Sequence, residues 1–124
     1  MSKKEIPQAF LIGADKETEW MIDWFITTYR NCGNMQKFVF ADFGLSPDGR
    51  KYVENHPMII GVMEMENKQP KAWFLKPEAM FFAPVHKCIW LDMDMEVKEK
   101  IDDMFDLLVP NKLCMVEDLS LIHI

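Results

Sequence analysis

The fold is decided by the stretch from residue 8 to residue 42, which reads QAFLIGADKETEWMIDWFITTYRNCGNMQKFVFAD. Its first run, Gln8–Gly13, is short and apolar, as in a buried strand. Within Glu17–Arg30 the apolar residues recur at intervals of three and four, which predicts an amphipathic helix, and Gly33 can end that helix in a left-handed C-cap. Lys37–Asp42 is rich in aromatic and β-branched residues and predicts a second strand. The stretch is therefore a strand–helix–strand unit.

The same alternation continues along the rest of the chain. Ser46 and Pro47 have the order of an N-cap followed by a proline at the first helical position, and they predict a short helix that runs to about Asn55. Strands that are apolar on both faces and separated by helices are typical of a mostly parallel sheet. We therefore expect an open, Rossmann-like α/β sandwich with helices on both faces of the sheet. The further expected elements are strands at 58–63, 87–91 and 112–116, a helix at 72–85 that Pro77 should begin, kink or split, and a helix at 97–108.

Composition excludes several classes of protein. The chain has 124 residues, of which 49% are hydrophobic and 27% charged, so it is neither a disordered chain nor a collagen-like repeat nor a coiled coil. A net charge of −6 without a basic run argues against nucleic-acid binding, which depends on phosphate neutralisation. No apolar stretch approaches the roughly 20 residues of a membrane helix, and the N-terminus is not a secretory signal. The three cysteines lack zinc-binding spacing, and their sparse, odd number predicts a reducing, cytoplasmic location.

Carboxylates accumulate where the predicted strands end. Asp15 follows the first strand, Asp42 ends the second, and both Asp92 and Asp94 follow the fourth. Open α/β sheets bind their ligands at the carboxyl ends of the strands, so this is the edge at which a site is expected. Asp15 could equally cap the helix that begins at Glu17.

The pair Asp92 and Asp94 carries the most chemical information. Two carboxylates at positions i and i+2, directly after an apolar strand, can converge on one hard cation. Oxygen ligands suit Mg²⁺ or Mn²⁺, and such ions usually keep water ligands and also bind substrate phosphates. A divalent ion can neutralise the charge that develops on a diphosphate leaving group. We therefore expect Asp92 and Asp94 to bind Mn²⁺ or Mg²⁺.

The surrounding residues resemble a known family. The segment IWLDMDMEV (89–97) is preceded by KAWFLKPEAM (71–80) and followed, after a predicted helix, by KLCMVED (112–118). This arrangement resembles nucleotide-sugar glycosyltransferases of the GT-A fold, and it is most similar to the glycogenin-like family 8 and related nucleotide-diphospho-sugar transferases. The resemblance implies transfer of a hexose from a UDP- or GDP-sugar to an acceptor hydroxyl. It also implies that Asp92 and Asp94 hold the metal that bridges the donor diphosphate.

The resemblance implies further contacts with the nucleotide-sugar donor. Gly13, Ala14 and Asp15 would lie near the base and the ribose. Lys76 would reach the donor from the helix that precedes the metal-binding strand. Asp42 matches the family's acidic residue near the end of the second strand less closely.

The resemblance covers only part of the family's fold. Members of the family take a further metal ligand, often a histidine, and their acceptor site from a second half that has no counterpart here. We therefore expect residues 1–118 to be the donor-binding part of a longer domain whose acceptor half is missing, and residues 119–124 to be a tail foreign to that domain. No catalytic nucleophile or base can be named. The donor sugar, the acceptor and the oligomeric state also stay open.

Two alternatives remain at this point. A haloacid-dehalogenase-type phosphatase also has an apolar strand followed by DxD, and Asp92 would then be a covalent nucleophile. That motif normally opens its domain, whereas Asp92 lies late in this chain. The other alternative is a fragment that binds a nucleotide but catalyses no reaction.

Overall fold

The fold is described from a computed structural model of the chain, which covers residues 6–65 and 76–108, with side chains in the second range from residue 79 onward. Its strands are β1 (Ile6–Ala14), β2 (Phe38–Asp42), β3 (Ile59–Glu64) and β4 (Val85–Trp90). Its helices are α1 (Ile22–Asn31), α2 (Pro47–Glu54) and α3 (Lys76–Phe82), with 3₁₀ segments η1 (Glu19–Met21) and η3 (Asp102–Leu107).

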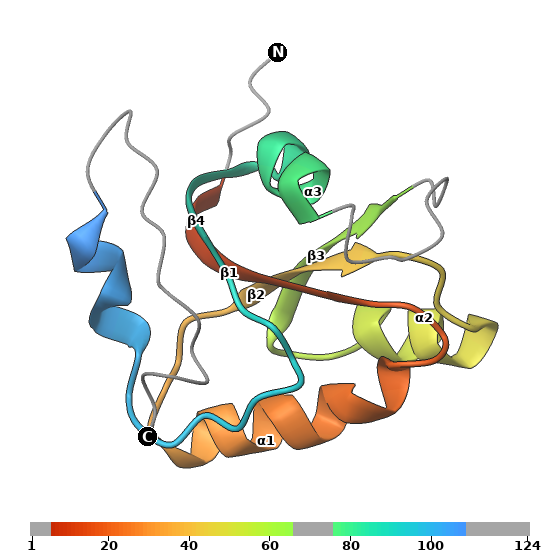
Figure 1. The fold of residues 1–124 in the computed structure, drawn as a ribbon, viewed down its shortest axis with the longest axis horizontal. Helices are drawn as coiled ribbons and strands as arrows, with labels where there is room; N and C mark the ends of the chain where they lie inside the picture. Colours follow the sequence, from red (N-terminus) through yellow and green to blue (C-terminus); the bar gives the residue numbers. More distant parts are fainter. Residues whose placement is uncertain (1–5, 66–75, 109–124) are drawn as a thin grey trace.

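The described strands form one sheet in which every pairing is parallel. Their order is β3-β2-β1-β4. The chain moves outward from β1 through β2 to β3, then crosses back and places β4 on the other side of β1 (Figure 1). The strand order therefore reverses between β1 and β4, and the predicted parallel α/β sheet is confirmed.

Helices cover both faces of this sheet, as predicted. Alternate residues of β1 point to opposite sides, so Phe10 and Ile12 belong to one buried cluster and Leu11 to the other. The larger cluster includes Phe25 of α1 and residues of α2 and η3, whereas the smaller one includes Ala79 of α3. Figure 1 shows α1 and α2 on one side of the sheet and α3 on the other.

The helix predicted over residues 97–108 is present only in part. Only Asp102–Leu107 is helical, and it is a 3₁₀ segment. The Asn34 side chain explains the difference. Its Oδ1 accepts the backbone N–H groups of Ile101 at 2.6 Å and Asp102 at 3.1 Å, and its Nδ2 donates to the carbonyl of Glu99 at 3.2 Å. These side-chain bonds take the backbone groups that an α-helix would pair internally.

The helix predicted over residues 72–85 is shorter than expected. α3 spans Lys76–Phe82, so Pro77 lies in its first turn, where the missing N–H removes no helical hydrogen bond. β4 then begins at Val85, earlier than predicted. Residues 72–75 and the strand predicted at 112–116 lie outside the described residues. Among the described helices, none has the length and apolar character that a membrane span requires.

Candidate functional site

The predicted site residues of β1 and β4 flank the point at which the strand order reverses. Leu11 of β1 is the partner of Trp90, the last residue of β4. β1 continues beyond this pair to Ala14. In open α/β sheets, ligands bind in the crevice outside the carboxyl ends of the strands at such a switch point. The structure therefore places Gly13–Asp15 and Asp92 beside the position where this fold type binds ligands.

The two aspartates of the DxD differ in their surroundings. Both lie just beyond β4, and Asp94 is in a turn. The indole Nε1–H of Trp90 donates to Asp92 Oδ1 at 2.8 Å, and Asp92 is partly buried. Asp94 is exposed, and it makes no hydrogen bond or ion pair with the residues that the structure describes. Asp92 is thus oriented by a neighbour, whereas Asp94 faces solvent.

Carboxylate oxygens, such as those of Asp92 and Asp94, suit a hard divalent ion. Within residues 6–65 and 76–108, no group of three or more histidine, cysteine, aspartate or glutamate side chains converges as a complete metal site. Mg²⁺ is commonly bound by one or two carboxylates, with water and substrate phosphates as its other ligands. Asp92 and Asp94 could serve as such a pair, because both provide carboxylate oxygens within a three-residue segment.

Gly13 has a packing role at the end of β1. A Cβ atom on Gly13 would lie 2.5 Å from Phe43 Cε2, 2.9 Å from the Ala41 carbonyl oxygen and 3.0 Å from Trp90 Cη2. The Phe43 and Trp90 rings also pack against each other, with centroids 6.0 Å apart. The absence of a side chain at Gly13 is therefore what lets both rings approach the β1 backbone.

Ala14 is the last residue of β1, and Asp15 begins the turn that follows it. Ala14 is buried, with 3% of its surface exposed. The Oδ1 atom of Asp15 accepts the backbone N–H groups of Glu17 at 2.9 Å and Thr18 at 3.1 Å, and also the Thr18 hydroxyl at 3.1 Å. Asp15 therefore stabilises the turn that leads into η1 and α1, but it does not cap a helix at Glu17, because η1 begins at Glu19 with Thr18 as its N-cap.

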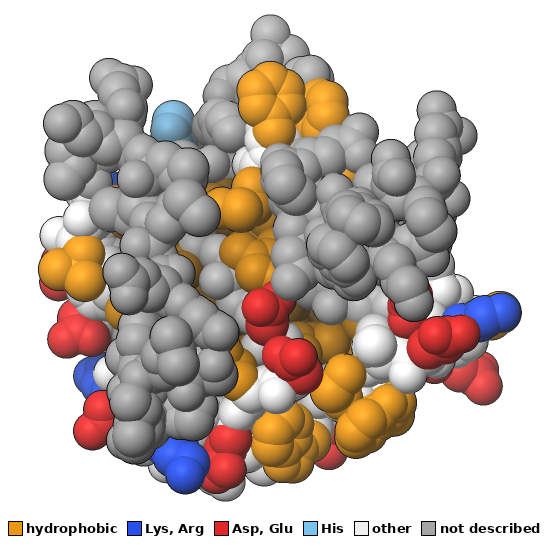
Figure 2. All heavy atoms as spheres, viewed as in Figure 1, with side chains coloured by type: hydrophobic (Ala, Val, Ile, Leu, Met, Phe, Trp, Pro, Cys, Tyr) orange, Lys and Arg blue, Asp and Glu red, His pale blue; other side chains and the backbone are white. Residues whose placement is uncertain are grey.

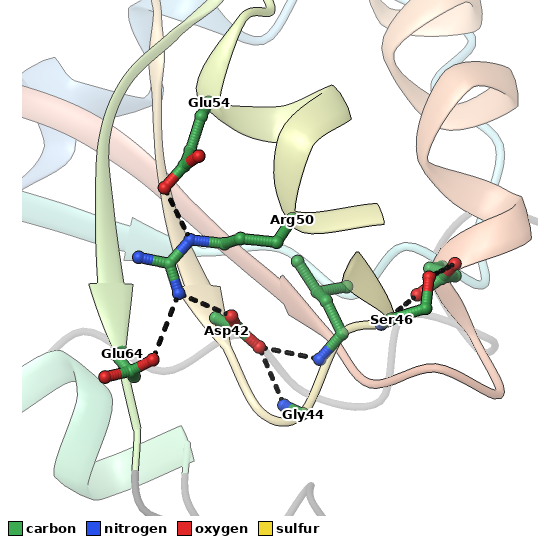
Figure 3. A network of polar contacts seen from close by, with 8 residues as sticks. Asp42, Gly44, Ser46, Arg50, Glu54 and Glu64 are labelled. Atoms are coloured by element: carbon green, nitrogen blue, oxygen red, sulfur yellow. Dashed lines mark hydrogen bonds and ion pairs between the residues drawn. The ribbon is translucent and has the colours of Figure 1, made fainter. Parts of the chain in front are cut away.

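Asp42 is held in a polar network at the end of β2 (Figure 3). Its Oδ1 accepts the backbone N–H groups of Gly44 at 2.8 Å and Leu45 at 2.7 Å. Its Oδ2 pairs with Arg50 Nη1 at 2.7 Å, and Arg50 also contacts Glu54 and Glu64. The hydrogen bond to Asp42 raises the pKa of the Arg50 guanidinium. The Asp42 carboxylate therefore holds the β2–α2 loop in place and forms an ion pair with the Arg50 guanidinium.

The amino end of α2 is also occupied by the chain itself. The Glu19 carboxylate accepts the Ser46 backbone N–H at 2.8 Å and the Ser46 hydroxyl at 2.6 Å, and the Ser46 hydroxyl in turn accepts from the Gly49 N–H at 3.1 Å. A carboxylate is favoured at this position by the helix dipole. A neighbouring depression of about 500 Å³ is lined by Asp42, Gly44, Leu45, Glu64 and Met65.

The structure brings some predicted site residues together and leaves others apart. Gly13 and Asp92 are linked through Trp90, whereas Asp42 belongs to the Arg50 network across β2 and β3. Lys76 is the first residue of α3, and its side chain is outside the described part of the chain. Sequence reasoning missed Trp90 and Arg50. Trp90 could have been identified as a hydrogen-bond donor two residues before the DxD. Nothing comparable in the sequence pointed to Arg50.

Acidic side chains are more frequent than basic ones on the face shown in Figure 2. This agrees with 20 acidic against 14 basic residues in the whole chain. Arg50 of α2 is already paired with Asp42 at the end of β2. The charge of Arg50 is therefore balanced by acidic side chains of the chain itself.

Comparisons with known proteins add no family assignment. No protein-family model matches the chain, and a search of curated proteins found no significant match. The features that characterise the chain are therefore its α/β fold, the all-parallel sheet formed by the described strands, and the DxD after β4.

Proposed function

We propose that this chain is the donor-binding part of a metal-dependent glycosyltransferase, which transfers a hexose from a nucleoside-diphosphate sugar to an acceptor hydroxyl. The observation that carries the proposal is the place of the DxD in the sheet. It follows β4, the strand that pairs with β1 at the point where the strand order reverses. Nucleotides bind at such switch points in doubly wound sheets.

The aspartates of the DxD would hold the metal. When bound, Mn²⁺ or Mg²⁺ would act as a Lewis acid on the departing diphosphate. Asp92 would be a pre-oriented ligand because the Trp90 indole holds its Oδ1, and Asp94 would turn toward the ion from the exposed turn. Binding of both carboxylates to one ion would order the segment after β4.

The ends of the other strands would contact the nucleotide. The segment Gly13–Asp15 lies at the switch point, where Gly13 and Asp15 are half-buried, so this segment could approach the base and the ribose. Lys76, at the start of α3, would reach the donor phosphates. Asp42 is a weaker candidate for ligand contact, since its carboxylate already receives two backbone N–H groups and Arg50.

The test is thermal denaturation of the chain with UDP- and GDP-sugars, each with and without Mn²⁺. A ligand that binds only the folded state raises the melting temperature, and a concentration of about 100 Kd adds about 2.7 kcal/mol. We expect a rise that requires both a nucleotide sugar and the metal. Asp94→Asn should abolish it, and Asp106→Asn, which changes another exposed carboxylate, should retain it.

Other outcomes of the same experiment separate the alternatives. Absence of a shift with every nucleotide and metal would contradict the proposal. A shift without hexose transfer or nucleotide-sugar hydrolysis would indicate a binding fragment without catalysis. Phosphate release from small phosphoesters, lost in Asp92→Asn, would support the phosphatase, in which Asp92 forms the phospho-enzyme.

A further inference from the structure

We infer that Trp90 is a positioning residue for Asp92, in that its indole fixes the carboxylate in the orientation in which it binds the divalent ion. The metal-binding part of this inference rests on the proposed function. The contact itself is a direct hydrogen bond of 2.8 Å from Trp90 Nε1–H to Asp92 Oδ1. An indole N–H group can donate a hydrogen bond but cannot accept one. It therefore orients the Asp92 carboxylate without itself acting as a ligand for a cation.

The Trp90 ring is itself held in place by the sheet. Its backbone is at the end of β4, opposite Leu11 of β1. The ring packs against Phe43, with an interplanar angle of 38°, and approaches the β1 backbone so closely that a Cβ on Gly13 would be 3.0 Å from its Cη2. The Phe43 ring and the β1 backbone at Gly13 therefore limit rotation of the indole. The N–H group that donates to Asp92 is thus held in one position.

This arrangement gives the two carboxylates different roles. Asp92 receives its orientation from a β4 side chain that packs against Phe43 and approaches β1 at Gly13, whereas Asp94 is exposed in the turn. Groups that orient metal ligands in this way typically change metal affinity 10- to 100-fold when they are removed. We therefore expect that loss of the indole N–H, with the aromatic ring retained, weakens binding of the ion by about 10- to 100-fold.

The experiment combines metal titration with the spectrum of the indole itself. In the full chain, Trp90→Phe should weaken Mn²⁺ binding, measured calorimetrically with UDP present, by about 10- to 100-fold. Trp24→Phe, which changes a half-exposed tryptophan on α1, should leave the affinity unchanged. Thermal melting of each variant checks that the fold is retained. In ¹⁵N spectra, the Trp90 indole N–H resonance, assigned through its scalar couplings in the wild-type chain, should shift in Asp92→Ala without any metal.

Two results would overturn the inference. An indole resonance that stays in place in Asp92→Ala shows that the hydrogen bond is absent, and this readout does not depend on the folding of Trp90→Phe. Wild-type affinity in a folded Trp90→Phe, with binding lost in Asp92→Ala, refutes the positioning role and leaves the proposed function standing. If the wild-type chain binds no Mn²⁺ with UDP, the proposed function fails, and the positioning role fails with it.

Discussion

Asp42 shows how a single acidic residue at the end of a strand can be structural. Its side chain is 9% exposed, and it accepts two backbone N–H groups and the Arg50 guanidinium. Removing such an acceptor leaves the backbone N–H groups of Gly44 and Leu45 without their partner, and a buried unpaired donor costs about 1–3 kcal/mol. The network in Figure 3 therefore predicts a large effect of truncation at this position.

We expect Asp42→Ala to lower the free energy of unfolding by about 2–4 kcal/mol. Asp42→Asn should cost less, because its amide oxygen can still accept the N–H groups of Gly44 and Leu45. Glu64→Gln is the control at the exposed end of the network, where the side chain is 81% exposed and the ion pair should contribute less than about 1 kcal/mol. Urea denaturation measures all three. Equal losses for Asp42→Ala and Glu64→Gln would contradict this account.

Gly13 provides a second test at the scale of one residue. We expect Gly13→Ala to destabilise the protein by about 1–3 kcal/mol, because the new methyl group would overlap the Phe43 ring and the Ala41 carbonyl. Gly61→Ala is the matched control in β3, since the nearest atom to its Cβ, on Val39, is 4.0 Å away. Chemical denaturation should show no destabilisation for the control. A tolerated Gly13→Ala would mean that the two rings do not pack as described.

Residue-level predictions from the sequence succeeded where a residue's role depends only on its neighbours in the sequence. Ser46 and Pro47 were predicted to begin a helix, and the Ser46 hydroxyl accepts the Gly49 N–H at the start of α2. The nucleotide role expected for Gly13 stays a prediction. Its contacts with Phe43 and Trp90 could not be predicted, because they join residues far apart in the sequence.

At the scale of the element, the segment before η3 is held by side chains of another loop. The Asn34 amide contacts the backbone of Glu99, Ile101 and Asp102, and the Asp102 carboxylate accepts the backbone N–H groups of Met35 at 2.7 Å and Gln36 at 3.2 Å. The two segments thus exchange hydrogen bonds in both directions. This reciprocal contact takes the place of an α-helix over residues 97–108.

We expect Asn34→Ala to destabilise the protein by about 2–4 kcal/mol, since Asn34 is 3% exposed and several backbone groups would lose their partner. Hydrogen exchange should also increase in residues 99–107 more than in α1. Asn55→Ala is the control, because the exposed Asn55 side chain donates to the Lys51 carbonyl within the last turn of α2, the helix that Asn55 caps. Unchanged exchange in residues 99–107 would show that Asn34 does not hold this segment.

The helix predictions show what sequence periodicity can and cannot decide. The three-to-four spacing over Glu17–Arg30 correctly predicted a helix, which is present as η1 followed by α1. A similar spacing over 97–108 predicted a helix, of which only the 3₁₀ segment Asp102–Leu107 is present. Periodicity reports which side chains face the core, and Phe105 is indeed buried. It carries no information on a distant asparagine that competes for the backbone.

At the scale of the whole molecule, both tyrosines favour their neutral form in the folded state. Burial, followed by the charge of Asp102, raises the pKa of Tyr29 far above its ordinary value. Burial, followed by a hydrogen bond to Asp23, raises the pKa of Tyr52 to about 12. These acids have higher pKa values in the folded than in the unfolded chain. The stability that they contribute is therefore complete below pH 10 and is lost as pH rises above it.

We expect the free energy of unfolding to fall above pH 10, and to fall less steeply in Tyr29→Phe. Tyrosinate absorbance gives a direct readout, because the chain contains only these 2 tyrosines. At pH 10 the folded protein should show far less tyrosinate than the urea-unfolded chain. Half ionisation of the folded protein at pH 10 would contradict the burial of Tyr29.

The general architecture could be predicted, because alternating apolar strands and amphipathic helices leave few arrangements other than a parallel α/β sheet. The strand order could not be predicted, because no local sequence feature indicates on which side of β1 the fourth strand pairs. That order determines which strand ends are neighbours. It places Asp92 beside the end of β1 and leaves Asp42 with Arg50 and β3.

The central claim is that Asp92 and Asp94 hold a divalent ion that binds a nucleoside diphosphate. The most direct measurement is calorimetric titration of UDP into the chain with Mn²⁺ and with a chelator, for the wild type and for Asp94→Asn. We predict that UDP binds only in the presence of Mn²⁺, and that Asp94→Asn weakens this binding at least about tenfold. UDP binding of equal strength with and without Mn²⁺, or an unchanged affinity in Asp94→Asn, would contradict the claim.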